Sequence, residues 1–353
     1  MRADQFIADP IFQVNLLIWM AIDQPSEAFR VRPLFHEHGF ELLYIEQPFP
    51  FPTEIRRRIE EAMVKAKLTI KLVPEPDILL QHRGQGKALY FEAKRSAFTA
   101  QSSNSEQARG HLLATGPAFG EVFDGLDSCL LVYVVPSLGE LTMRQCLDEL
   151  TRDLTMLGLT VGRSSVDALG VAGTSVVYQL DSITAQHIGT SGGSMPVIEG
   201  LAEETDPSPL LLVYSDEDYP DEAGRGLYRR ALQNQVIARL LCDLQHAPIH
   251  SDFPLNARDL LVGTTAGVFE FLGKQRQTSM ERLIVQNVFR RIAEFWAERI
   301  PGLVKVQHRQ AIFYFVDEAR KDEFLDWLES SKKTNFADTK PKVSEQVELF
   351  ATE

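Results

Sequence analysis

Two acidic residues and a lysine in the first third of the chain have the types and spacing that phosphate chemistry needs. Asp77 follows Pro76 at the start of an apolar segment, and Glu92 and Lys94 end the next one. The glycine-containing stretch 83–86 predicts a tight turn between these segments, so a hairpin brings Asp77 near Glu92. Because side chains alternate along a strand, Glu92 and Lys94 project from the same face.

Carboxylates that converge on one point repel each other, and a hard divalent cation relieves that repulsion. Carboxylate oxygens are the ligands that Mg²⁺ prefers, with Mn²⁺ as a substitute. Such a cation can polarise a phosphodiester and lower the pKa of its bound water. Lys94 could orient or deprotonate that water, or stabilise charge on the phosphate oxygens. The alternative is a solvated Glu92–Lys94 cross-strand pair with no chemical role.

The elements around these residues follow the order helix, three strands, helix, strand. The apolar stripe at 54–66 predicts the first helix, and the capping-box spacing from Ser103 to Glu106 starts the second. The expected strands lie at about 68–73, 76–82, 87–94 and 129–135, and a helix at 141–157 and a strand at 175–180 extend the same sheet. The near-continuous apolar run at 129–135 is typical of a strand buried on both faces.

On these residues, the segment of about 54–135 resembles the PD-(D/E)xK nuclease superfamily, which has the restriction-endonuclease-like fold. The matching residues are Pro76-Asp77, Glu92-Ala93-Lys94, and Gln107 on the following helix. The resemblance implies an α/β mixed-sheet core in the order α-β-β-β-α-β, and a second, mainly helical C-terminal domain follows it.

The resemblance also implies a role for each matching residue. Asp77 and Glu92 would bind Mg²⁺ together with the backbone carbonyl of Ala93. Lys94 would assist the nucleophilic water, and Gln107 would support the site.

The chain departs from the family pattern at two points. Some branches of the superfamily carry Gln-x-x-x-Tyr, whereas here Gln107 is followed four residues later by His111. An acidic residue of the first helix often completes the site. Glu60 and Glu61 are available, but neither lies on the predicted buried stripe, so this ligand stays open.

The charge distribution limits how the chain could bind nucleic acid. The formal net charge is −13, which argues against a protein that coats nucleic acid through bulk charge. Residues 51–115 nevertheless carry 11 basic and 7 acidic side chains, as a local phosphate-binding cleft requires. The candidate contacts to DNA phosphates are Arg83, Lys87, Arg95 and Arg109.

Composition shifts along the chain predict its domain organisation. We expect a nuclease domain at 1–186, a linker at 187–209, a mainly helical domain at 210–330 and a disordered polar tail at 331–353. The helical domain would supply target recognition or a homodimer contact.

The C-terminal tail carries a short motif of its own. Gln346, Leu349 and Phe350 resemble the peptide by which bacterial proteins dock on the DNA polymerase sliding clamp. Leu349 and Phe350 would fill an apolar pocket, and Gln346 would hydrogen-bond beside it. The alternative is an apolar pair that folds back on its own domain.

Several classes of protein are disfavoured. The sequence has no run of about 18 apolar residues that could span a membrane. Its first residues do not show the basic and then apolar pattern of a signal peptide, and its 3 cysteines are too few for a disulfide framework, so we expect a cytoplasmic protein.

The sequence therefore favours a Mg²⁺-dependent nuclease that acts on DNA in restriction, phage defence or repair, the pathway being inferred from resemblance alone. The alternative is a non-catalytic interaction module that has kept the fold. In that case the segment 116–225, with 4 basic and 18 acidic side chains, would bind a basic protein partner.

Overall fold

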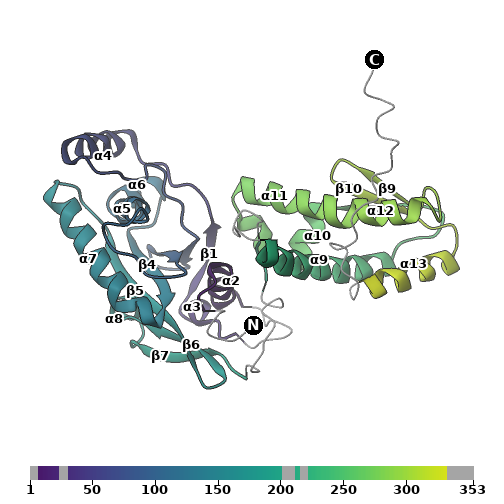
Figure 1. The fold of residues 1–353 in the computed structure, drawn as a ribbon, viewed down its shortest axis with the longest axis horizontal. Helices are drawn as coiled ribbons and strands as arrows, with labels where there is room; N and C mark the ends of the chain where they lie inside the picture. The colour runs from purple at the N-terminus through teal and green to yellow at the C-terminus, as the bar shows by residue number, and fades with distance from the viewer. Residues whose placement is uncertain (1–6, 24–30, 201–210, 215–221, 332–353) are drawn as a thin grey trace, which may run out of the picture. The chain divides into compact units, whose positions relative to one another are not determined.

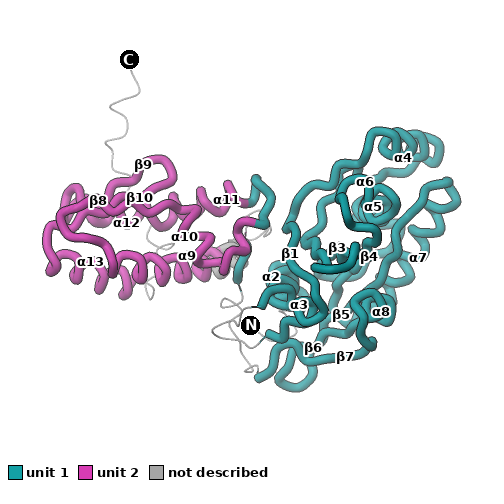
Figure 2. The backbone as a smooth tube through the Cα atoms, turned by 180° about the vertical axis from the view of Figure 1, so that it is seen from behind, with its two compact units in different colours: residues 1–213, 271–276 teal, residues 214–270, 277–353 magenta. Residues whose placement is uncertain are grey.

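The computed structural model describes residues 7–23, 31–200, 211–214 and 222–331. The chain forms two compact units (Figure 2). The first comprises residues 1–213 with 271–276, and the second comprises residues 214–270 with 277–353. No helix within the described ranges is long and apolar enough to cross a membrane.

A seven-stranded mixed sheet forms the centre of the first unit, with its strands in the same order in space as in sequence. The strands are β1 (Phe40–Ile45), β2 (Ile78–His82), β3 (Lys87–Ala93), β4 (Ser128–Pro136), β5 (Arg163–Ala172), β6 (Ser175–Leu180) and β7 (Gly193–Ile198). The pairs β3–β4 and β4–β5 are parallel, and all other neighbouring pairs are antiparallel. Parallel neighbours need a crossover connection, and helices supply both crossovers. The predicted α/β class is confirmed.

Helices cover both faces of the central strands (Figure 1). One face packs against α4 (Thr53–Ala66), α5 (Ser105–Ala114), α6 (Ala118–Val122) and α7 (Glu140–Met156). On the other face lie α2 (Pro10–Ala21) and α3 (Leu34–Glu37), where the Phe35 ring contacts Phe91 and Tyr178 at centroid distances of 5.0 and 6.0 Å. Since β3 and β4 are buried on both sides, any polar side chain on them needs a partner.

The expected strand at 68–73 is wrong, so the order α-β-β-β-α-β does not hold as predicted. These residues run along α5 instead: the Lys71 backbone N–H donates to the Glu106 carbonyl at 3.1 Å, and a Cβ on Gly110 would lie 2.6 Å from the Lys71 carbonyl oxygen. The edge of β2 that faces away from β3 pairs with β1, with Leu42 opposite Leu80, so β2 has no edge left for residues 68–73. The third strand of this part of the sheet therefore comes from before α4.

The sheet also extends into the segment expected to be a linker. Gly193–Ile198 form β7, which pairs with β6 through Tyr178 and Met195. Gly189 has a φ of 83° and ends α8 (Ser182–Ile188) as a left-handed cap. The glycine- and serine-rich composition here thus marks a helix end and an edge strand, and residues 201–210 lie outside the described ranges.

The second unit is mainly helical and contains a small antiparallel sheet. Its helices are α9 (Glu222–Gln245), α10 (Ala257–Thr264), α11 (Lys274–Ile284) from residue 277 on, α12 (Arg290–Ala297) and α13 (Glu318–Ser331), with a π-helical turn at Val285–Phe289. Its strands are β8 (Asp252–Asn256), β9 (Val304–Gln307) and β10 (Gln310–Tyr314), in the order β8-β10-β9. β9 and β10 form an antiparallel hairpin, with Ala311 opposite Val306.

Asn15 on α2 fixes a distant part of the chain to the first unit. Its side-chain oxygen accepts hydrogen bonds from the backbone N–H groups of Leu212 at 2.6 Å and Val213 at 2.9 Å. Its amide donates to the carbonyls of Val213 at 3.1 Å and Ile11 at 2.8 Å. Asn15 is buried, so the backbone groups that it satisfies have no ready access to water.

Asn15→Ala should therefore destabilise the first unit. Removing the amide leaves buried backbone groups unsatisfied, at about 1–3 kcal/mol for each group, and we expect a loss of roughly 2–4 kcal/mol in the free energy of unfolding. Urea denaturation measures this loss. The control is Asn104→Ala, because Asn104 is exposed and makes no capping hydrogen bond. Equal stabilities of the two variants would contradict the role given to Asn15.

Candidate functional site

The β2–β3 hairpin places Asp77 at the position across from Glu92. Ile78 pairs with Phe91, and the Asp77 backbone N–H donates to the Phe91 carbonyl at 3.1 Å. The Ala93 backbone N–H donates to Asp77 Oδ2 at 2.6 Å. This bond clamps the Asp77 carboxylate against the end of β3, beside the strand position that Glu92 occupies.

Glu92, Lys94 and Gln107 form one hydrogen-bonded group. Lys94 Nζ donates to Glu92 Oε1 at 2.5 Å and to Gln107 Oε1 at 3.0 Å. The Gln107 amide in turn donates to Glu92 Oε1 at 2.9 Å. The four predicted side chains therefore come together from the hairpin and from α5.

Three further side chains surround Glu92 that the sequence interpretation did not assign to the site. His111 Nε2 lies 3.6 Å from Glu92 Oε2, and the Tyr90 and His111 rings are 5.1 Å apart, edge to face. Tyr133 is the partner of Glu92 in the parallel β3–β4 register. The signals for Tyr90 and His111 were local: Tyr90 is two residues before Glu92, and His111 is four residues after Gln107. Tyr133 could not be found without the register.

The site contains buried polar atoms without partners. The hydroxyls of Tyr90 and Tyr133, both ring nitrogens of His111 and Oε2 of Glu92 make no hydrogen bond among the described residues. Most buried polar groups in native proteins are hydrogen-bonded, and exceptions often mark a functional site. Among the described residues, the group around Glu92 is therefore only partly satisfied by hydrogen bonds.

Burial and charge set the protonation states here. Burial raises the pKa of Glu92, and the nearby Lys94 ammonium opposes that shift. Burial alone would lower the pKa of Lys94, but Glu92 and Asp77 together raise it above its usual range. Burial, followed by the charges of Lys94 and Lys71, lowers the pKa of His111 well below its usual range. At neutral pH Lys94 is therefore charged and His111 is neutral.

The donor set fits a hard cation. Carboxylate oxygens from Asp77 and Glu92 are the chemistry that Mg²⁺ takes, and one Glu92 oxygen has no hydrogen bond. Among the described residues, no three His, Cys, Asp or Glu side chains group together as a metal site, so a third acidic ligand is not present there. Glu60 and Glu61 are exposed on α4 and pair with Arg56 and Arg57 at 3.0 and 2.7 Å.

Two of the four predicted phosphate contacts lie at the wrong end of the hairpin. Arg83 follows β2 and pairs with Glu41 at 3.3 Å, and Lys87 starts β3 and donates to the His187 carbonyl at 3.2 Å. Glu92 is at the opposite end of β3. Arg83 and Lys87 flank the β2–β3 turn, and the length of β3 therefore separates them from Glu92 although they are close to it in sequence.

The other two predicted contacts lie closer to the site. Arg109 on α5 donates to the carbonyls of Thr69 and Ala100 at 3.2 and 3.3 Å, which holds the adjoining loops. Arg95 is exposed and directly follows Lys94. Of the four, Arg95 is the one best placed to meet a phosphate.

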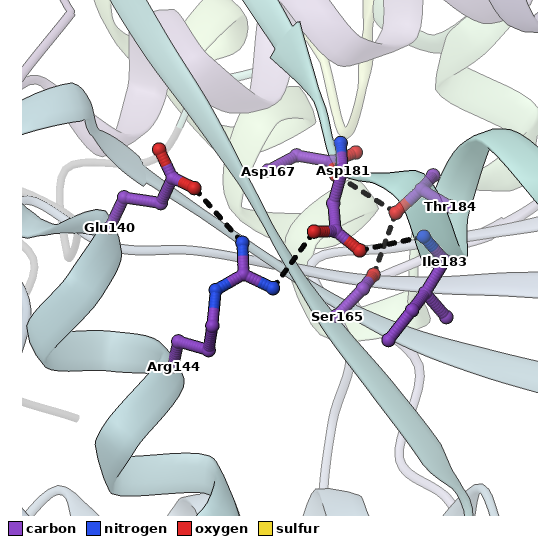
Figure 3. Close-up of polar contacts among 7 residues, drawn as sticks. All are labelled: Glu140, Arg144, Ser165, Asp167, Asp181, Ile183 and Thr184. Atoms are coloured by element: carbon purple, nitrogen blue, oxygen red, sulfur yellow. Dashed lines mark hydrogen bonds and ion pairs between the residues drawn. The ribbon is translucent and has the colours of Figure 1, made fainter. Parts of the chain in front are cut away.

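A second buried carboxylate lies on the other face of the sheet. Asp167 on β5 accepts hydrogen bonds from the Tyr178 hydroxyl at 2.7 Å, the Thr184 hydroxyl at 2.8 Å and the Asp181 backbone N–H at 2.9 Å. The Ser165 and Thr184 hydroxyls are 2.7 Å apart (Figure 3). These bonds fix the start of α8 against β5.

Asp181 links this group to α7. Its carboxylate caps α8 by accepting from the Ile183 N–H at 2.7 Å, and it accepts from Arg144 at 2.8 Å. Arg144 also donates to Glu140 at 2.9 Å (Figure 3). Each polar group in this second cluster has a partner, as in a structural anchor, whereas the cluster at Glu92 leaves several groups without one.

The predicted tail residues Gln346, Leu349 and Phe350 lie outside the described residues. Comparisons with protein-family models, curated proteins and solved structures find no match to this chain. Its function must therefore be argued from the geometry of the site.

Asp167 should make stability fall as the pH rises. Burial raises its pKa from 3.8 to about 7, so between these values the folded state holds a proton that the unfolded state releases. Stability from this carboxyl is full below about pH 4 and is lost as the pH approaches 7, by on the order of 4 kcal/mol.

Asp167→Asn removes the titration, keeps Oδ1 as the acceptor for the Asp181 N–H and the Thr184 hydroxyl, and replaces the Oδ2 that accepts from Tyr178 by an amide donor to that hydroxyl. The difference in unfolding free energy between variant and wild type, from urea denaturation, should therefore move in favour of the variant between pH 4.5 and 8. Asp148→Asn, at an exposed position on α7, is the control. Parallel curves for wild type and Asp167→Asn would show that this carboxyl does not titrate in that range.

Proposed function

We propose that the chain is a metal-dependent nuclease that hydrolyses phosphodiester bonds of DNA, with a restriction-endonuclease-like core in its first unit. The observation that carries the proposal is a buried Glu92, 1% exposed, that contacts both Lys94 and Gln107 and lies across from Asp77. A solvated Glu92–Lys94 pair with no chemical role would be exposed. Burying a carboxylate and an ammonium together is costly, and active sites are where such pairs are commonly kept.

The metal would be held by Asp77, Glu92 and the Ala93 carbonyl. When bound, Mg²⁺ polarises the phosphodiester and lowers the pKa of the attacking water. The asymmetry of Glu92 supports this arrangement: Oε1 accepts from Lys94 and Gln107, whereas Oε2 has no hydrogen bond among the described residues.

Lys94 would stabilise charge on the phosphate oxygens. Its Nζ donates to Glu92 Oε1 and to Gln107 Oε1, so it would act as a cation and hydrogen-bond donor. Gln107 positions both partners, because its oxygen accepts from Lys94 and its amide donates to Glu92. The same hydrogen bonds orient the ammonium and the carboxylate.

Cleavage of plasmid and single-stranded DNA with Mg²⁺ or Mn²⁺ tests the proposal. Lys94→Ala and Glu92→Gln should each lower the rate by about 100-fold or more, because each removes charge from the reacting centre. Lys87→Ala is the matched control, since Lys87 is on the same hairpin but at the far end of β3. Its rate should equal that of the wild type, and circular dichroism should show that all the variants are folded.

The outcome also decides between a nuclease and a non-catalytic interaction module. Cutting that persists in Lys94→Ala would remove the catalytic role of this lysine. No cutting by the wild type, together with no effect of metal on its melting temperature, would favour the interaction module.

Metal binding should stabilise the folded chain through Asp77. A ligand at 100 times its Kd adds about 2.7 kcal/mol of stability, so Mg²⁺ should raise the melting temperature. Asp77→Asn keeps an acceptor for the Ala93 N–H but removes the charge, and the response to Mg²⁺ should disappear. Asp124→Asn, an exposed site, should respond as the wild type does. The same response in Asp77→Asn would place the metal elsewhere.

A further inference from the structure

A cavity of about 260 Å³ lies next to the candidate site within the first unit. Its lining residues are Tyr44, Gln47, Pro48, Phe49, Pro50, Pro76, Leu79, Tyr90, Val122 and Phe123. Two of them connect it directly to the site: Pro76 precedes Asp77, and Tyr90 is two residues before Glu92 on the same face of β3. The nuclease site proposed above does not use this cavity.

The strand register fixes how far the cavity lies from the carboxylates. Tyr44 pairs with Leu79 and Leu79 with Tyr90, so these three side chains form one row across β1, β2 and β3. The Asp77 and Glu92 positions form the next row on that face. Two residues along a strand span about 7 Å, so the cavity begins about that far from the carboxylates.

The walls of the cavity are aromatic. The Phe123 ring lies 5.8 Å from Tyr44 and 5.9 Å from Phe49 between centroids. Proline fixes φ, which stiffens the 48–50 segment, and the Phe49 N–H donates to the Pro74 carbonyl at 2.7 Å. Flat aromatic walls on a stiff backbone suit a flat ligand, and nucleic-acid bases stack on such side chains whatever their identity.

The size and polar groups of the cavity favour a single base. Its volume is below the roughly 300–1,000 Å³ of pockets for drug-sized ligands, so one small flat ring system fits best. Gln47 lines the cavity, and its amide can hydrogen-bond the edge of a base. A base within a duplex cannot enter, because its edge is paired and its faces are stacked.

We propose that this cavity binds one unpaired nucleobase of the strand whose phosphate lies at Asp77 and Glu92. The inference rests on the proposed nuclease function and specifies its substrate: single-stranded DNA, or a strand whose base has left the duplex. In a nucleotide the base is one sugar away from the phosphate, which agrees with a cavity one row of the sheet away from the carboxylates.

Binding without cleavage tests this proposal. The probe is a dye-labelled single-stranded oligonucleotide, with the same strand in a duplex for comparison, measured by fluorescence anisotropy with Mg²⁺ in the Lys94→Ala background. The single strand should bind at least about tenfold more tightly than the duplex, given the strength of base–aromatic stacking.

Val122→Trp fills the cavity from α6 and should remove that preference by weakening single-strand binding about tenfold. Val64→Trp is the matched control, because Val64 is 81% exposed on α4. Its binding should be unchanged. Phe123→Ala gives a second test by removing a stacking wall, and melting temperatures show that each variant is folded.

Equal affinity for single strand and duplex would overturn the proposal, as would a Val122→Trp variant that binds the single strand like its parent. Failure of the proposed nuclease function can be distinguished from failure of the cavity proposal. If the nuclease function fails, the chain with Lys94 intact cuts no DNA, while the anisotropy series still decides whether the cavity holds a base.

Discussion

The carboxylate of Glu92, buried between the mixed sheet and α5, is the constraint on which the first unit depends. A strand covered on both faces can carry a charged side chain only if neighbouring elements supply its partners. The hairpin end supplies Lys94, and α5 supplies Gln107 and His111. The position of α5 along the sheet is thus tied to the chemistry at the end of β3, and hydrophobic packing alone would not fix it.

The two buried carboxylates of this sheet show how much local surroundings matter. Asp167 accepts three hydrogen bonds from hydroxyls and a backbone N–H, with no cation beside it. Oε1 of Glu92 accepts from an ammonium and an amide, whereas Oε2 makes no hydrogen bond within the described ranges. Burial raises the pKa of both groups. The first arrangement satisfies both carboxylate oxygens and holds elements together, whereas the second satisfies only one oxygen with hydrogen bonds from the described residues.

The sequence predicted contacts between site residues that are close along the chain, and it missed a contact between residues that are far apart along it. Asp77, Glu92 and Lys94 belong to one hairpin, so turn chemistry and strand alternation were enough to bring them together. Gln107 followed from a helix predicted on the Ser103–Glu106 capping-box spacing; the helix does form, as Ser105–Ala114, but without a side-chain capping hydrogen bond at Asn104. Tyr133 approaches Glu92 through the pairing of β3 with β4, and no local pattern encodes the register between parallel strands.

The errors have the same origin. Residues 68–73 are apolar enough for a strand, but a strand needs a free edge, and β1 occupies that of β2. Gly193–Ile198 read as a linker by composition, yet β6 offers them an open edge. The ends of the sheet depend on which segment reaches an edge, and that is a property of the whole fold.

Gly110 shows what the close packing of α5 requires. Glycine in the middle of a helix lowers its intrinsic stability by about 0.5–1 kcal/mol relative to alanine. In α5 a glycine is needed at this position, because a Cβ on residue 110 would lie only 2.6 Å from the Lys71 carbonyl oxygen. The same approach brings the chain around Lys71 to the side of α5 that bears Gln107 and His111. Gly110, which has no side chain and no charge, therefore sets how closely the Lys71 ammonium can approach Glu92.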